Sequence, residues 1–451
     1  MYRMMIAAPS SGTGKTSVTI ALLGALKKKG IDVCSFKCGP DYIDPMYHRS
    51  VLGVECHNAD LFFLSEDGLK KEYARYASGK EACVFEGVMG FYDGIGTTDA
   101  AGSAWHVADT LDIPVILVVN PRGASLSVSA LIKGFNEFKA PSHVAGVILN
   151  QTTRGMCDYL AKQIEETTGV PVFGFLPKVE EAALESRHLG LYTSGEISEL
   201  SEKLDILSDR FLESVDLDRL LEACKADEVP EAPETVRLST RATVAVAHDD
   251  AFCFIYSETL DLLRDCGADI EYFSPINDTE VPENADAIYL PGGYPELYAD
   301  RLFLNAKMRE DIREKIASGI PTLAECGGFL YLSKYLSDDS DREWEMAGVL
   351  PGKAENTGKL VRFGYCTITA KEDGLLFKKG ESVKAHEFHY WDSTENGSSF
   401  TAVKPSGRSW ECGFSTDSLY AGFPHLYLPS APQAAMRFVD KAEEYRRSKK
   451  V

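Results

Sequence analysis

The sequence lacks the features that mark secreted and membrane-spanning proteins. Its 11 cysteines are scattered and odd in number and include no CxxC pair, which indicates reduced thiols rather than a disulfide framework. No apolar run reaches the about 18 to 20 residues that a membrane helix requires. The short apolar start, MYRMMIAAPSSG, leads directly into a motif, so we interpret it as a first strand and not as a signal peptide. A cytoplasmic location is therefore the default expectation.

Positive charge is also scarce. The chain has 47 Lys and Arg residues against 68 Asp and Glu residues, which gives a formal net charge of −21. Because a surface that seeks nucleic-acid phosphates is basic, this balance argues against nucleic-acid binding, but a local site can still accept an anionic substrate. The length of 451 residues, with 44% hydrophobic residues, suits two or three globular domains.

Strand and helix patterns alternate along the first half of the chain. Short apolar runs predict strands at residues 4–8, 32–36, 82–86, 114–120, 145–150 and 172–176. Helical spacing predicts helices at residues 17–29, 127–138 and 156–167. This alternation indicates βαβ units, and the continuous apolar strands fit a doubly wound, mostly parallel sheet that is covered on both faces. We therefore expect a three-layer α/β domain over residues 1–224.

An acidic segment with prolines then interrupts the pattern. Residues 225–240 read KADEVPEAPETVRLST, have no periodicity and are predicted to be a linker. The alternation restarts beyond it, with strands predicted at residues 243–248, 270–273, 287–290 and 322–325 and helices at residues 256–266 and 307–318. The tail from 360 to 428 is richer in strand signals. Residues 241–451 are thus predicted to form a second three-layer α/β domain.

A glycine-rich loop joins the first predicted strand to the first predicted helix. It reads APSSGTGKT from Ala8 to Thr16 and is one residue longer than the standard phosphate loop. In such a loop the backbone N–H groups point at phosphate oxygens, the lysine adds charge beside the β- and γ-phosphates, and the hydroxyl can bind Mg²⁺. The residues expected to bind the nucleotide are Ser11, Gly12, Thr13, Gly14, Lys15 and Thr16.

Acidic residues follow the predicted strands of the same domain. GPDYIDP carries Asp41 and Asp44, and VFEGVMGFYDG carries Glu86 and Asp93. The carboxyl ends of parallel strands converge on one crevice, so these side chains are expected to bind metal or substrate there. Asn150, at the end of GVILN, either reads adenine through its amide or caps a strand end.

A cysteine on a sharp turn marks the second domain. In IPTLAECGGFLYL, an apolar strand ends at Glu325, Cys326 follows, and two glycines precede a helix. This is the arrangement of a nucleophile elbow, which projects one reactive side chain beside helix N–H groups. A helix N-terminus is expected to lower the thiol pKa. A buried, inert cysteine is the alternative.

An acyl intermediate on this thiol needs an oxyanion site and a base. The turn Gly292–Gly293 in YLPGGYPE offers backbone N–H groups for the oxyanion. His425, in AGFPHLYLP, is the histidine that we expect to act as the base. His386 and His389, in KAHEFHY, are its rivals, and they either shape the site or belong to the core.

Together these motifs resemble the cobyrinic acid a,c-diamide synthase family, which joins a dethiobiotin-synthetase-like ATP domain to a class I glutamine amidotransferase domain. The resemblance spans nearly the whole chain. It rests on SSGTGKT, KCGPDYIDP, FEGVMGFYDG, GVILN, SRHLGL, AVAHDDAFCF, YLPGGYPE, ECGGFLYL and HEFHY, in that order. PDYIDP and AFCF distinguish this family from cobyric acid synthase.

The resemblance implies a defined reaction. ATP would phosphorylate the a and c side-chain carboxylates of the macrocycle in turn, and ammonia released from glutamine at Cys326 would displace the phosphate. Lys15 and Thr16 would hold ATP and Mg²⁺, and Asp41 and Glu86 would contribute to the metal site. Asp44 and Asp93 would lie near the reacting carboxylate. His425 would be the glutaminase base.

Some positions depart from the family pattern. Ala8 stands where glycine is usual, and Asn120 stands where a strand-ending aspartate is common, so Asn120 receives no metal role. Tyr427 replaces the glutamate that follows the catalytic histidine in many class I glutaminases. A Cys–His dyad is consistent with this replacement, and the group that would activate His425 is left open.

Two kinds of alternative remain at this point. The same chemistry could act on hydrogenobyrinic acid or on nickel-sirohydrochlorin, because no motif specifies the central metal. A different class is an ATPase switch like MinD, but such a switch has no use for a thiol on an elbow. The sequence leaves the oligomeric state open, with a homodimer as one possibility.

Overall fold

The structure is a computed structural model of the 451-residue chain. It describes residues 1–96, 98–180, 194–226, 231 and 237–449, and the SRHLGL motif at residues 186–191 lies outside them. The chain divides into two compact units, and the division falls within the predicted linker at residues 225–240. None of the helices in the described ranges is both long and apolar enough to cross a lipid bilayer.

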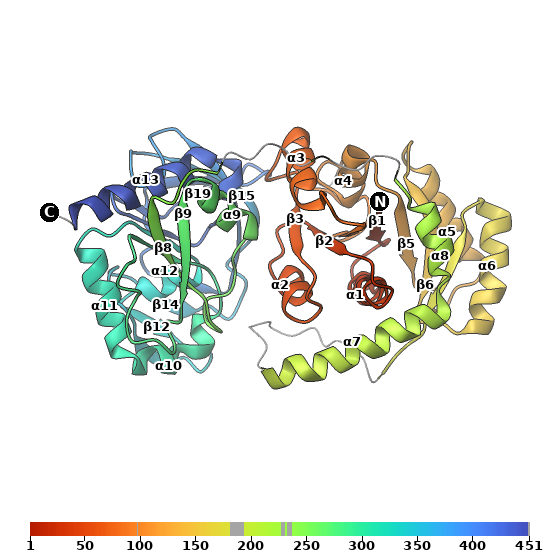
Figure 1. Ribbon diagram of the computed structural model, residues 1–451, viewed down its shortest axis with the longest axis horizontal. Helices are drawn as coiled ribbons and strands as arrows, with labels where there is room; N and C mark the ends of the chain where they lie inside the picture. Colours follow the sequence, from red (N-terminus) through yellow and green to blue (C-terminus); the bar gives the residue numbers. More distant parts are fainter. Residues whose placement is uncertain (97, 181–193, 227–230, 232–236, 450–451) are drawn as a thin grey trace. The chain divides into compact units, whose positions relative to one another are not determined.

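The first unit is built on one parallel sheet. Its seven strands lie in the order β3-β2-β4-β1-β5-β6-β7 (Figure 1). The strands are β1 (Tyr2–Ala7), β2 (Val33–Cys38), β3 (Cys56–Ala59), β4 (Ala82–Glu86), β5 (Val115–Val119), β6 (Val144–Asn150) and β7 (Val172–Leu176). Alternate residues of β1 face opposite sides: Met4 and Ile6 belong to one buried cluster, and Met5 and Ala7 to another. Both faces are therefore covered, as the continuous apolar runs predicted.

Helices pack on the two faces of this sheet. They are α1 (Lys15–Lys28), α2 (Ile43–Ser50), α3 (Glu66–Ala77), α4 (Ala104–Leu111), α5 (Leu126–Glu137), α6 (Arg154–Thr168), α7 (Ser194–Ser214) and α8 (Leu217–Ala223). Helices α1, α7 and α8 share a buried cluster on one face, whereas α3 and α4 cover part of the other face. Helices α5 and α6 complete that second face. The doubly wound, three-layer architecture expected from the sequence is confirmed.

Replacing each of two glycines of the first unit with alanine should change the free energy of unfolding in opposite directions. Gly134 is exposed inside α5 and has no neighbouring atom within 4 Å of a built Cβ. Gly146 in β6 would place its Cβ 2.1 Å from Cε2 of the buried Phe173. Gly134→Ala should raise the free energy of unfolding by about 0.5–1 kcal/mol because alanine restricts the unfolded chain. Gly146→Ala should lower it by about 1–3 kcal/mol through overpacking. Urea unfolding of both variants measures the difference, and equal shifts would contradict it.

The second unit has a central sheet and two smaller ones. The central order is β20-β21-β11-β10-β8-β9, and its strands are parallel except β20. These strands are β8 (Ala242–Ala247), β9 (Ala268–Phe273), β10 (Ala287–Leu290), β11 (Thr322–Glu325), β20 (Phe414–Ser415) and β21 (Leu419–Gly422). The four-stranded sheet contains β12 (Tyr335–Ser337), β13 (Glu343–Glu345), β14 (Lys353–Asn356) and β17 (Trp391–Ser393). The five-stranded sheet contains β15 (Arg362–Ala370), β16 (Ser382–His389), β18 (Phe400–Val403), β19 (Ser409–Cys412) and β22 (His425–Leu426).

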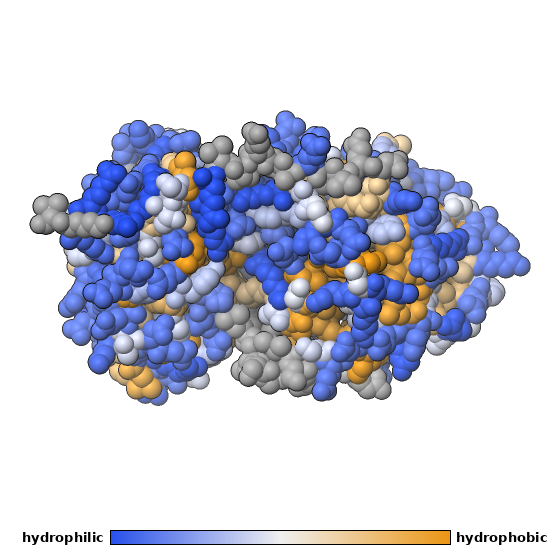
Figure 2. Space-filling view, viewed as in Figure 1, coloured by the Kyte–Doolittle hydropathy of each residue, from blue (hydrophilic) through white to orange (hydrophobic). Residues whose placement is uncertain are grey.

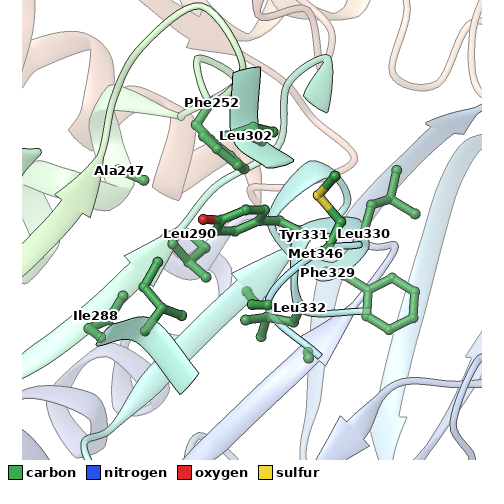
Figure 3. Packing of buried hydrophobic residues seen from close by; sticks show 14 of the residues in the cluster. Ala247, Phe252, Ile288, Leu290, Leu302, Phe329, Leu330, Tyr331, Leu332 and Met346 are labelled. Atoms are coloured by element: carbon green, nitrogen blue, oxygen red, sulfur yellow. The ribbon is translucent and has the colours of Figure 1, made fainter. Parts of the chain in front are cut away.

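Helices cover the central sheet of this unit on both faces. They are α9 (Ser257–Asp265), α10 (Ala299–Leu304), α11 (Ala306–Ala317), α12 (Gly327–Leu332) and α13 (Pro432–Ser448), with short 3-10 turns at η1 (Pro295–Tyr298) and η2 (Leu428–Ser430). Helices α10 to α12 pack on one face, and α9 and α13 pack on the other. In the first of these cores Tyr331 lies edge-on to Phe252, with ring centroids 5.4 Å apart (Figure 3). This contact packs the last turn of α12, the helix that begins directly after Cys326.

Hydrophilic residues predominate on the face shown in Figure 2, and hydrophobic residues appear there as separate groups. All eleven cysteines are free and buried.

Candidate active sites of the two units

The phosphate loop occupies the gap between β1 and α1. Gly12 and Gly14 have φ angles of 75° and 100°, a left-handed conformation that favours glycine. Lys15 is 8% exposed, and its Nζ donates to the carbonyls of Ser10 (3.2 Å) and Met89 (2.5 Å). Burial, followed by the nearby charge of Lys37, lowers the pKa of Lys15. The lysine is thus held at the mouth of the loop by two carbonyl groups.

Asn150 supports this loop from the end of β6. Its side-chain nitrogen donates to the carbonyl of Thr13 at 2.8 Å, and the residue is 2% exposed. A Cβ on Gly14 would lie 2.0 Å from the same nitrogen, so the close approach requires glycine there. The hydrogen bond to Thr13 is what a side chain with a structural role at the strand end would make. Recognition of adenine by Asn150 stays a prediction.

Glu86 lies under the first turn of α1. Its Oε1 accepts hydrogen bonds from the hydroxyl of Thr16 (2.6 Å) and from Nζ of Lys37 (2.8 Å). The side chain is fully buried, and burial raises its pKa to about 7 although Lys37 opposes the shift. The other oxygen, Oε2, has no hydrogen-bond partner among the described residues. An orphaned, buried carboxylate oxygen beside Thr16 is a hard ligand that fits Mg²⁺.

Lys37 was not among the site residues predicted from the sequence, but it lies among the predicted acidic ones. It is the second-last residue of β2 and is 5% exposed. It forms ion pairs with Glu86 (2.8 Å), Asp41 (3.9 Å) and, at short range, Asp44. Burial alone would lower the pKa of Lys37, but the three carboxylates raise it well above its usual value. A permanent ammonium group therefore lies among the predicted acidic residues.

The pKa values of the two aspartates of PDYIDP shift in opposite directions. Asp41 accepts a hydrogen bond from the Ile43 N–H at 2.8 Å, and burial raises its pKa to about 6. Burial also acts against ionisation of Asp44, but Lys37 overcomes it and lowers the pKa of Asp44. In the described part of the chain, no three His, Cys, Asp or Glu side chains converge as a metal site. The metal role of Asp41 stays a prediction.

Asp93 reaches the phosphate loop through its own turn. Its Oδ2 accepts from the Gly90 N–H at 2.9 Å, and the next amide, of Phe91, donates to the carbonyl of Ala8 at 2.9 Å. The residue is exposed. The structure thus brings the Asp93 loop to the start of the phosphate loop, with its carboxylate accessible to a substrate.

Cys326 lies on a strained turn at the end of β11. Its φ angle is 43°, in the left-handed region that side chains rarely adopt, and its N–H donates to the Gly422 carbonyl at 2.8 Å. Gly328 is the second residue of α12, and a Cβ there would lie 2.1 Å from the Leu290 carbonyl oxygen. This close approach requires glycine in the first turn of the helix. This conformation is that of a nucleophile elbow.

The predicted base lies against the predicted oxyanion turn. A Cβ on Gly292 would be 2.1 Å from Cε1 of His425, and a Cβ on Gly327 would be 2.9 Å from the Gly293 nitrogen. The Gly292 turn therefore has the imidazole on one side and the elbow on the other. The catalytic roles of Cys326, His425, Gly292 and Gly293 stay predictions that this arrangement supports.

The protonation state at rest differs from the expected thiolate. Burial, followed by the charges of Glu296 and Glu387, raises the pKa of Cys326 well above its usual range, and the Gly327 N–H opposes only part of this shift. Burial lowers the pKa of His425 to about 3. A neutral thiol beside a neutral imidazole is a pair in which His425 can take the proton as the thiol reacts.

The rival histidines lie on the neighbouring strand β16. His386 is the register partner of His425, and His389 stacks on Phe423 with ring centroids 3.8 Å apart. Nδ1 of His389 is 2.6 Å from the Trp391 carbonyl, and its Nε2 is 3.5 Å from Glu387. Both histidines are buried beside His425, which fits a role in shaping the site.

Gly292→Ala should separate glutamine chemistry from the rest of the enzyme. The added methyl group overlaps the His425 ring, so the ring must move away from the turn. Glutamine-dependent activity should fall about 10²-fold, as expected for a misplacement of about 1 Å. Activity with high ammonium should stay within about twofold of the wild-type rate. Steady-state assays with the two nitrogen sources measure both, and an undiminished glutamine rate would contradict this placement of His425.

Comparisons with known families match the two units separately. Residues 4–191 match the CobQ/CobB/MinD/ParA nucleotide-binding domain, and residues 243–431 match the CobB/CobQ-like glutamine amidotransferase domain. The phosphate loop and the cysteine elbow lie within these respective ranges. The chain is therefore a glutamine-dependent carbon–nitrogen ligase with a nucleotide-binding domain.

Similar proteins span the whole chain. A cobyrinate a,c-diamide synthase of Listeria innocua is 40% identical and covers 97% of this chain and 98% of its own length. Its counterpart in Caldanaerobacter subterraneus is 39% identical over 98% of this chain and 99% of its own. The counterpart in Thermoplasma volcanium is 35% identical over 100% and 99%. The chain belongs to the cobyrinate a,c-diamide synthase family.

Proposed function

We propose that this enzyme amidates the a and c carboxylates of cobyrinate with nitrogen from glutamine, as a step of cobalamin biosynthesis. The observation that carries the proposal is the pairing, in one chain, of a phosphate loop with a cysteine elbow beside His425. The loop supplies carboxylate activation, and the elbow supplies nitrogen. An ATPase switch accounts for the first feature alone.

Activation of the carboxylate belongs to the first unit. ATP transfers its γ-phosphoryl group to the substrate carboxylate and gives an acyl phosphate. Thr16 and the free oxygen of Glu86 would hold Mg²⁺, which would screen the charge of the phosphates. Lys37 would place a positive charge beside the carboxylate of the substrate and the phosphates of the nucleotide. Asp44 and Asp93 would orient the substrate, and Asp41 would serve the metal site.

Nitrogen release belongs to the second unit. The thiol of Cys326 attacks the side-chain amide carbon of glutamine while His425 accepts the thiol proton and then passes it to the leaving ammonia. The turn at Gly292 and Gly293 would donate N–H groups to the oxyanion. Water then hydrolyses the thioester to glutamate.

We assign these two chemistries to two domains, at residues 1–224 and 241–451, which are joined by residues 225–240. We place the enzyme in the cytoplasm because its cysteines are free.

Product mass spectrometry tests the substrate assignment. Purified enzyme is incubated with ATP, Mg²⁺ and glutamine and with cobyrinate, hydrogenobyrinate or nickel-sirohydrochlorin in turn. Each amide replaces one oxygen with one nitrogen, so two exchanges on cobyrinate are expected. Exchange only on hydrogenobyrinate or on nickel-sirohydrochlorin would overturn the assignment, and so would ATP hydrolysis without any exchange.

A further inference from the structure

A second buried carboxyl group lies directly beside the glutaminase elbow. Glu325 is the last residue of β11 and immediately precedes Cys326, and it is 2% exposed. Its Oε1 accepts a hydrogen bond from the Leu426 N–H at 2.9 Å, and its Oε2 accepts one from the Tyr289 hydroxyl at 2.8 Å. The mechanism described above does not use this group.

The first of these bonds links the nucleophile to the base. One end of it belongs to the neighbour of Cys326, and the other end to the neighbour of His425. His425 and Leu426 form the two-residue strand β22, which pairs with β16 on one side. Strand β21 has already ended at Gly422, so the chain that carries His425 has left the central sheet. The Glu325 carboxyl ties this segment back to that sheet.

Burial of a carboxyl group is costly unless hydrogen bonds or an opposite charge compensate it. The residues around it are apolar or aromatic, including Tyr289, Tyr420 and Leu426, and none of its hydrogen-bond partners is cationic. Burial raises the pKa of Glu325 to about 8. The group is therefore mostly protonated near neutrality. An amide side chain of the same length keeps the acceptor for the Leu426 N–H, and its nitrogen can donate to the Tyr289 hydroxyl.

We propose that Glu325 is a positioning residue of the glutaminase site, which holds the His425 strand in register with the Cys326 elbow through the Leu426 N–H. This inference rests on the proposed glutaminase role of Cys326 and His425. The Glu325 bond attaches the residue next to His425 to the end of the central sheet.

Two conservative variants of Glu325 test separately the length of its side chain and its ionisable carboxyl group. Glu325→Gln keeps the length and one acceptor for Leu426 but removes the ionisable proton. Glu325→Asp keeps the carboxyl group but shortens the side chain by roughly 1.5 Å, one carbon–carbon bond. A positioning role predicts that the Gln variant keeps glutamine-dependent kcat within about threefold. It also predicts that the Asp variant loses ~10²-fold in kcat, with little change in the KM for glutamine.

Controls identify where the loss arises. Ammonia-dependent amidation should stay at the wild-type rate in both variants, which shows that the first unit is intact. An unchanged unfolding transition of the second unit shows that the unit that carries Glu325 is folded. Tyr289→Phe removes only the Oε2 bond, so its glutamine-dependent kcat should stay within about threefold. Asp286→Asn changes a buried carboxyl group at the opposite end of β10, where Oδ2 accepts from the Thr243 N–H at 2.9 Å, and it should not reduce glutaminase activity.

The outcomes distinguish the inference from the function on which it rests. Absence of glutaminase activity in the wild-type chain would overturn the proposed function itself. An active wild type with an equally active Glu325→Asp variant would overturn the positioning role alone. A Gln variant as inactive as the Asp variant would also overturn it, because the carboxyl chemistry would then be required. If the Asp variant fails to fold, loss of glutamine-dependent activity in Glu325→Gln still overturns the proposal.

Discussion

Replacing Cys326 with alanine is expected to abolish the use of glutamine and to leave amidation with ammonium intact. The variant removes the only atom on the elbow that can form the acyl intermediate, so the glutamine-dependent rate should fall by at least ~10³-fold. Ammonium supplies nitrogen without the second unit, so the ATP-dependent rate at high ammonium should stay within about twofold. Parallel assays with glutamine and with ammonium chloride measure both rates.

A second buried cysteine of the same unit provides the control. Cys366 is fully buried in β15 and has no role in the proposed chemistry. Cys366→Ala should cost some stability, as removal of a buried group does, and should keep both activities. If Cys326→Ala loses ammonium-dependent activity as well, the residue is not confined to glutaminase chemistry.

Replacing Glu86 with glutamine should have the converse effect. The amide cannot offer the anionic oxygen that Mg²⁺ requires beside Thr16, and it removes one of the three charges that balance Lys37. ATP-dependent amidation should fall at least ~10²-fold with either nitrogen source. The unfolding transition of the second unit should not change, because Glu86 belongs to the first unit.

The matched control is a glutamate just before the same strand. Glu81 precedes β4, and its Oε2 accepts from the Asp32 N–H at 2.9 Å, whereas Glu86 ends β4. Glu81→Gln should therefore leave amidation within about twofold. Wild-type amidation rates in Glu86→Gln, measured over a titration of Mg²⁺, would remove Glu86 from the metal site.

The strands and loops of the two candidate sites could be predicted from the sequence because a local residue pattern determines each of them. Strands β10 and β11 have the predicted bounds, because each is a short apolar run between turn residues. The phosphate loop and the elbow were found because the strand, the glycines and the helix are contiguous in sequence. Helix α1 begins at Lys15, earlier than the apolar spacing indicated, since the loop itself supplies its first turn.

What the sequence could not show depends on contacts between distant segments. No role was predicted for Lys37, because Asp41, Asp44 and Glu86 come together around it only in the folded chain. No role was predicted for Glu325, because its hydrogen-bond partner Leu426 is distant from it in the sequence. The thiol pKa was also misjudged, because the helix N-terminus was visible in sequence whereas the burial of Cys326 was not. The surroundings of Lys37, Glu325 and Cys326 all form only when distant segments of the chain fold together.

The central claim is that nitrogen released at Cys326 becomes the amide nitrogen of a carboxylate activated by ATP. Mass spectrometry of the product formed from cobyrinate, ATP and glutamine labelled with ¹⁵N at its side-chain amide tests this claim most directly. The account predicts ¹⁵N in both new amides with the wild-type enzyme. It predicts unlabelled amides when Cys326→Ala receives the same glutamine together with unlabelled ammonium. Labelled amides from Cys326→Ala, or a wild-type product without label, would contradict it.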